Sequence, residues 1–123
     1  MEIVKIKTND LKPYSKNAKK HSKKQIERIA KSIESFGFND PIGIWKDNIV
    51  IEGHGRLEAL KQLGYDEVEC IRLDHLTDEE RRAYTLAHNK VSESEWDFDL
   101  LNEEMDEILS FDMEDFGFEF VDE

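Results

Sequence analysis

The sequence predicts an α+β fold. Two observations indicate this class: short runs rich in Ile and Val that are typical of strands, and longer segments whose apolar residues recur at helical spacing. The chain has 123 residues, which suits one compact domain. We expect a small sheet with flanking helices in residues 1–92. Residues 93–123 are expected to form an acidic helical extension, which could begin a linker to a further domain.

Four segments are typical of strands. The first is "EIVKIKT" (2–8), and the last is "EVECIRL" (67–73). Between them, "PIGIWK" and "NIVIE" are expected to pair across a tight turn at Asp47-Asn48. Residues 9–21 are expected to be a loop, because they contain Pro13 and Asn17.

Four segments have the spacing of helices. Ser22 and Gln25 form a capping-box pattern before the first helix, and Gly37 is placed to end it in the left-handed conformation. A short helix over 57–63 is followed by a glycine. Thr77 and Glu80 form a second capping box before a helix that runs to Lys90. A last helix is expected over 99–109, followed by a phenylalanine-rich end that should pack on something, which could be absent from this chain.

Charge is distributed unevenly along the chain. Residues 1–62 carry a net charge of +5 and residues 63–123 a net charge of −17, which together give −12. The basic residues concentrate between positions 12 and 31. This asymmetry argues against a protein that binds duplex DNA over its whole surface, and it favours one local anion site.

Membrane insertion and a disulfide framework are not expected. No apolar run approaches the ~20 residues that a spanning helix needs. The first ten residues carry acidic side chains and no apolar core of a signal peptide. Cys70 is the only cysteine, which fits a reducing, cytoplasmic location and a buried packing role.

The segment "IEGHGR" (51–56) is the strongest candidate site. Gly53 and Gly55 permit a sharp turn and close approach of a ligand to the backbone, and the amides of a helix start favour an anion. Arg56 would bind the same phosphate, and His54 could donate a hydrogen bond or transfer a proton. On spacing alone, an ordinary strand-to-helix turn is an equally good interpretation, because short glycine motifs are weak evidence.

Two further segments carry candidate ligands. In "AHNK" (87–90), Asn89 and Lys90 could reach a phosphate or magnesium, although a plain helix terminus is the favoured interpretation of this segment alone. The lysines between 16 and 24 precede a capped helix and could contact a triphosphate or nucleic acid, or could simply be solvated. The histidines show no metal spacing with Cys70, so a zinc site is rejected. The P-loop, the dinucleotide fingerprint and a serine nucleophile elbow are also missing.

Taken in order, these segments resemble the N-terminal domain of ParB-type proteins, in the ParB/sulfiredoxin superfamily. The matching stretches are "LKPYSKNAKKH", "IAKSIESFGFNDPIGIW", "IEGHGRLEALKQLGYDEVECI" and "LAHNK". The resemblance implies a small mixed sheet and a nucleotide site for CTP or ATP with magnesium. It implies phosphate contacts at Gly53, His54, Gly55 and Arg56, with Asn89 also near the metal, Lys90 nearby, and Lys19 and Lys20 as candidate gates.

Departures from the ParB pattern leave alternatives open. His54 and Gly55 replace the Glu and Arg of the ParB box, which leaves the choice of nucleotide and its hydrolysis undecided. A Gly-His-x-Arg box also resembles free-serine kinases of the superfamily, so phosphotransfer with His54 or Glu52 as base is an alternative function. A third possibility is a DNA-binding or nuclease domain that uses the basic N-terminal segment. Sulfiredoxin activity is excluded, because His54 stands where that enzyme has cysteine.

The whole chain is most similar to ParB-like domains that precede DNA modification methylases in phages and mobile elements. Those domains carry a "GHGR" box, an "A.NK" segment and an acidic stretch rich in Trp and Asp. The implied partners are a nucleotide, DNA bound directly or through a methylase, and a second copy in a dimer. The cofactor and catalytic motifs of a methylase are absent, so we expect no methylation by this chain alone.

Overall fold

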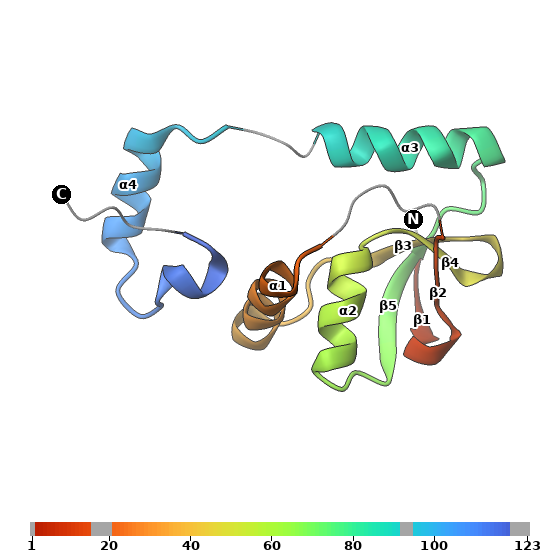
Figure 1. Ribbon diagram of the computed structural model, residues 1–123, viewed down its shortest axis with the longest axis horizontal. Helices are drawn as coiled ribbons and strands as arrows, with labels where there is room; N and C mark the ends of the chain where they lie inside the picture. Colours follow the sequence, from red (N-terminus) through yellow and green to blue (C-terminus); the bar gives the residue numbers. More distant parts are fainter. Residues whose placement is uncertain (1, 16–20, 92–94, 119–123) are drawn as a thin grey trace.

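The computed structural model describes residues 2–15, 21–91 and 95–118 (Figure 1). It confirms an α+β fold with a five-stranded mixed sheet. The strands are β1 (Ile3–Lys7), β2 (Lys12–Pro13), β3 (Ile42–Trp45), β4 (Ile49–Glu52) and β5 (Glu67–Arg72). The helices are α1 (Lys23–Phe36), α2 (His54–Gln62), α3 (Asp78–Val91) and α4 (Phe98–Glu107), with 3₁₀ turns η1 (Thr8–Asp10), η2 (Lys46–Asn48) and η3 (Met113–Phe116).

The sheet has the strand order β1-β5-β3-β4-β2. β1 pairs with β5, and β3 pairs with β4, in antiparallel fashion. β3 and β5 are parallel, as are β2 and β4. The strand β2 is a correction to the expected loop, because Pro13 lies in it. Proline is tolerated there since β2 is an edge strand, where a missing backbone donor costs little.

The local chemistry explains where most elements begin and turn. The Ser22 hydroxyl accepts a hydrogen bond from the Gln25 amide at 3.1 Å, as the capping pattern predicts. In the β3–β4 connection, Asp47 and Asn48 both have positive φ, 62° and 60°, which confirms the tight turn. Gly37 follows α1 with φ 86° and ψ 168°, so its φ is positive but its conformation is not left-handed helical as expected.

One hydrophobic core lies between the sheet and the pair α1 and α2, which lie side by side in Figure 1. Its buried members come from all three: Leu11, Ala30, Ile33, Ile42, Ile44, Val50, Leu57, Ala59, Leu60, Val68 and Cys70. Cys70 is fully buried, and burial raises the pKa of its thiol to about 11. The packing role expected for this cysteine is therefore confirmed.

Helix α3 is attached to the sheet largely through Arg81. Its guanidinium lies between the rings of Tyr14 and Trp45, 4.6 and 4.7 Å from their centroids, and 2.7 Å from Asp78. The capping box at the start of α3 is confirmed, because Thr77 and Glu80 exchange hydrogen bonds of 2.9 and 3.1 Å. These contacts hold the start of α3 against Trp45 of β3 and Tyr14, which follows β2.

The C-terminal segment differs from expectation in two ways. Helix α4 ends at Glu107, so Ile108 and Leu109 lie outside it. Phe111 and Phe116 pack on Phe36 of α1, with ring centroids 5.0 and 5.3 Å apart. The surface that these two phenylalanines cover therefore belongs to this chain. Within the described residues, the structure contains no helix of the length and apolar character that a membrane span requires.

Candidate functional site at the start of α2

The candidate site is the turn between β4 and α2. Gly53 is the N-cap of α2 and has φ 100° and ψ 27°, a conformation that favours glycine. The Leu57 amide is bonded to the Gly53 carbonyl at 2.9 Å, so the amides of residues 53–56 have no acceptor within the helix. Among the described residues, no side chain makes a capping hydrogen bond at this end. The turn therefore presents a set of backbone donors at the positive end of the helix dipole.

Both glycines of the turn are closely surrounded. A Cβ atom on Gly53 would lie 3.0 Å from Arg56 Nη2 and 3.3 Å from Ile42 Cγ1. A Cβ atom on Gly55 would lie 2.9 Å from Nδ1 of His21, whose ring covers the backbone there. Close packing thus favours glycine at both positions, and at Gly53 the positive φ favours it as well.

His54 contacts the loop that precedes α1. Its Nε2 accepts a hydrogen bond from the Tyr14 amide at 3.2 Å. Burial, and then the nearby His21, lower the pKa of His54 below its ordinary value of 6.5, while Glu58 opposes this shift. His54 is therefore a neutral imidazole near pH 7, and its second ring nitrogen carries the proton.

The lowered pKa of His54 predicts how stability depends on pH. As the pH falls below 6.5, the unfolded chain binds a proton at this histidine before the folded chain does. The free energy of unfolding should therefore decrease from pH 7 towards pH 5. His54→Asn should make this decrease shallower, measured by urea unfolding at each pH. Identical slopes for the two proteins would contradict the assignment.

Arg56 is held by acidic groups rather than open to the turn. Its Nη2 lies 2.7 and 2.8 Å from the two carboxylate oxygens of Glu52 and donates to the Pro41 carbonyl at 3.0 Å. Its Nη1 lies 3.3 Å from Asp40. Its Nε is buried and has no hydrogen-bond partner in the part of the chain that the structure describes. A phosphate bound directly by Arg56 would have to exchange with one of these carboxylates.

Helix α3 lies beside Glu52 and contributes further side chains to the candidate site. His88 Nε2 lies 3.6 Å from Glu52, and the His88 ring stacks on Tyr84 with centroids 5.5 Å apart. Burial, and then the negative charge of Glu52, raise the pKa of Tyr84. The Thr85 hydroxyl donates to the Ile51 carbonyl at 3.1 Å and fixes this part of α3 against β4.

The residues predicted from the sequence are only partly brought together. Glu52, Gly53, His54, Gly55 and Arg56 form one continuous turn. Asn89, half-buried, and Lys90, exposed, follow His88 in the last turn of α3, so the helix that carries them is placed next to Glu52. Lys19 and Lys20 lie outside the described residues.

Sequence reasoning missed the residues that hold the turn in place. They are Tyr14, His21, Asp40 and His88. Each lies more than ten residues from its partner in the turn, so no local spacing indicates the contact. The one detectable pair was Glu52 and Arg56, which carry opposite charges four positions apart.

The fold and this turn define a class of protein: an α+β domain of the ParB/sulfiredoxin type, with a glycine turn and a helix start after the fourth strand. Residues 1–90 match the ParB N-terminal domain, and the chain belongs to this family. It is 38% identical over 82 residues to the ParB-like nuclease domain-containing protein YnaK of Escherichia coli (strain K12). That match covers 67% of this chain and 94% of the relative.

Solved structures that resemble this fold include the following three. The chromosome-partitioning protein ParB from Caulobacter crescentus, complexed with CTP-gamma-S, gives a TM-score of 0.68 at 16% identity, over 78% of this chain and 56% of that one. Sulfiredoxin from Arabidopsis thaliana gives 0.56 at 19% identity, over 70% and 98%. A mutant free serine kinase in complex with ADP gives 0.54 at 25% identity, over 63% and 34%. This chain thus spans about half of that ParB chain and a third of the kinase.

Proposed function

We propose that this chain is a nucleotide-binding module whose ligand places its phosphates at the Gly53–Arg56 turn. The observation that carries the proposal is the start of α2, where backbone donors lie at a glycine turn without a side-chain cap from any residue that the structure describes. Support comes from the similar structures, which include ParB with CTP-gamma-S and free serine kinase with ADP. CTP and ATP are therefore the first ligands to test.

The turn fits a phosphate better than it fits a bare cation. The backbone donors and the helix dipole supply positive potential, while Glu52 and Asp40 balance the charge of Arg56. Within the described residues, no three side chains of His, Cys, Asp or Glu form a metal cluster. A magnesium ion would bring charge neutralisation to the phosphates, with Asn89 as the proposed protein ligand.

Binding is favoured over catalysis by the state of the two candidate bases. The Nε2 lone pair of His54 is occupied by the Tyr14 amide, and Glu52 is paired with Arg56. Either base would need to leave its partner before it could accept a proton from a substrate. The alternative of a small-molecule kinase or nucleotide hydrolase nevertheless has one supporting feature: Glu52 lies beside His88, within a cluster of titratable groups.

We further propose an association with DNA handling, in which the module acts next to a DNA-modifying partner such as a methylase. The ParB family and the nuclease-domain name of the Escherichia coli relative support a DNA context. A dimer and a phage or mobile-element origin are proposals of the same kind.

A thermal-shift panel tests the proposed function. CTP or ATP with magnesium should raise the melting temperature, and Gly55→Ala should weaken that rise, since its Cβ atom forces His21 to move over the turn. Gly64→Ala is the control at the other end of α2: no described atom lies within 4 Å of its added Cβ, and although its φ of 81° makes the change destabilising, the nucleotide-induced rise should be retained. No shift with any nucleotide would contradict the proposal. Nucleotide turnover that survives purification and vanishes in His54→Ala would instead favour the enzyme.

A further inference from the structure

The segment 111–118 lies along α1, away from the candidate nucleotide site. Phe111 and Phe116 contact Phe36 near the end of α1. Two turns earlier, Arg28 passes next to Gly117, where a Cβ atom would lie 3.2 Å from Arg28 Cδ. The segment therefore spans about 12 Å of the helix, from Phe36 back to Arg28.

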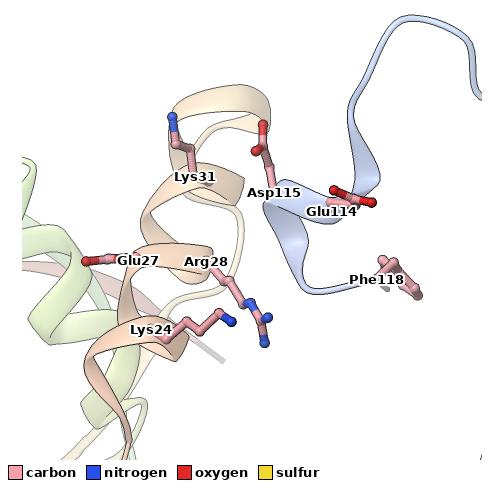
Figure 2. A pocket seen from close by; sticks show the side chains of 7 residues that line it. All are labelled: Lys24, Glu27, Arg28, Lys31, Glu114, Asp115 and Phe118. Atoms are coloured by element: carbon pink, nitrogen blue, oxygen red, sulfur yellow. The ribbon is translucent and has the colours of Figure 1, made fainter. Parts of the chain in front are cut away.

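A groove of about 540 Å³ remains between this segment and α1 (Figure 2). Lys24, Arg28 and Lys31 line it from the helix, together with Glu27. Glu114, Asp115 and Phe118 line it from the opposite side. Within the described chain, no ion pair shorter than 4 Å joins the two walls. Opposite charges thus face each other across the groove without being locked together.

The wall on α1 has two features of a surface that binds single strands. Lys24, Arg28 and Lys31 recur at intervals of four and three residues, so they share one face of the helix. Phe36, in the last turn of the same helix, does not line the groove and lies roughly a third of a turn around the axis from the three cations; its ring is 50% exposed and offers a stacking surface beyond the end of their row. A row of cations beside an exposed aromatic ring is how proteins bind the phosphates and bases of single-stranded nucleic acid.

The covering segment has the complementary chemistry. Glu114 and Asp115 place carboxylates opposite the cations of α1, and the rings of Phe111 and Phe116 pack on Phe36 at interplanar angles of 47° and 41°. The attachment is shallow, because Phe111 stays 46% exposed and η3 is a single turn. A cover held in this way can be displaced by a stronger polyanion.

We propose that the surface of α1 formed by Lys24, Arg28 and Lys31, with Phe36 beyond the end of their row, binds single-stranded nucleic acid, and that the segment 111–118 is an internal competitor for it. The basic groove contains no residue of the Gly53–Arg56 turn, whereas Phe36 also lines a hollow that reaches Asp40 and Arg56. The uneven charge of the chain acquires a physical role in this arrangement, since acidic residues of the second half shield basic residues of the first.

Fluorescence anisotropy with a short labelled DNA single strand tests this proposal at low salt. Phe111→Ala/Phe116→Ala should bind at least about fivefold tighter than the unmodified chain, because two aromatic contacts that hold the cover are removed. Glu114→Gln/Asp115→Asn should tighten binding to a smaller degree. Phe111→Ala/Phe116→Ala is the uncovered variant. Adding Lys24→Gln, Arg28→Gln and Lys31→Gln to it should abolish its gain in affinity for the single strand.

The matched control adds Lys5→Gln, Lys7→Gln and Lys12→Gln to the same uncovered variant. These exposed lysines lie on β1 and β2, so the control loses equal charge away from α1 and should retain tight binding. Equal loss in both triple variants, or no gain on uncovering, would overturn the proposal. Equal affinity for duplex DNA would overturn the role of Phe36. Melting curves verify that each variant folds. If the α1 variants leave the nucleotide-induced rise in melting temperature unchanged, the surface on α1 is distinct from the α2 turn.

Discussion

Arg56→Ala is expected to lower the free energy of unfolding by about 2–4 kcal/mol, because it leaves the carboxylate of Glu52 buried without its partner. The Glu52 side chain is only 15% exposed, and Arg56 20%. The loss should be visible by urea denaturation at pH 7. Glu52→Ala/Arg56→Ala should cost less than the sum of the single changes, because the double variant buries no unpaired charge.

Lys61→Ala provides the matched comparison. Lys61 pairs with Glu58 at 3.8 Å on the same helix, but both side chains are exposed to solvent. Its removal should change stability by less than about 0.5 kcal/mol. An effect of Arg56→Ala as small as this would show that the Glu52–Arg56 pair does not hold the turn. Because Arg56→Ala is expected to destabilise the turn itself, a loss of nucleotide binding in this variant is not sufficient evidence that Arg56 contacts a phosphate.

Gly53→Ala is expected to lower the free energy of unfolding by about 2–3 kcal/mol, of which about 1–2 kcal/mol comes from the positive φ. The remainder comes from Cβ contacts of 3.0 Å to Arg56 Nη2 and 3.3 Å to Ile42 Cγ1. The change should also disturb the Glu52–Arg56 pair, since it pushes on the guanidinium. Thermal and urea unfolding measure the effect.

Gly64→Ala separates these two contributions. Gly64 has a comparable φ of 81°, but nothing lies within 4 Å of its added Cβ atom. It should cost only the backbone strain, about 1–2 kcal/mol. If Gly53→Ala costs no more than Gly64→Ala, the close packing described around Gly53 is wrong.

Much of the fold was predictable because its signals are local. The Ser22–Gln25 and Thr77–Glu80 caps join residues three apart, and the positive φ at Asp47 and Asn48 follows from residues that tolerate that conformation. The short strand β2 was not predictable in this way. Its pairing with β4 depends on a neighbour more than thirty residues away, which outweighs the turn preference of Pro13.

The candidate site was predictable as a backbone turn but not as a network of side chains. The glycines and the helix start lie within six consecutive residues, 51–56, so local sequence indicates them. The contacts of Asp40 with Arg56, His21 with Gly55, and His88 with Glu52 exist only once the chain is folded. They change the expected chemistry, because Arg56 is neutralised by carboxylates and His54 is a neutral acceptor.

The backbone amides of the α2 turn can be followed directly by ¹H–¹⁵N NMR during titration with CTP or ATP and magnesium. A phosphate site at this turn predicts saturable shifts of the His54, Gly55 and Arg56 amides, since these donors would bind phosphate. The amide resonances of Lys24, Arg28 and Lys31 on α1 should not shift. Saturable binding without shifts of the α2-turn resonances, or with shifts of the α1 resonances instead, would contradict a phosphate site at Gly53–Arg56.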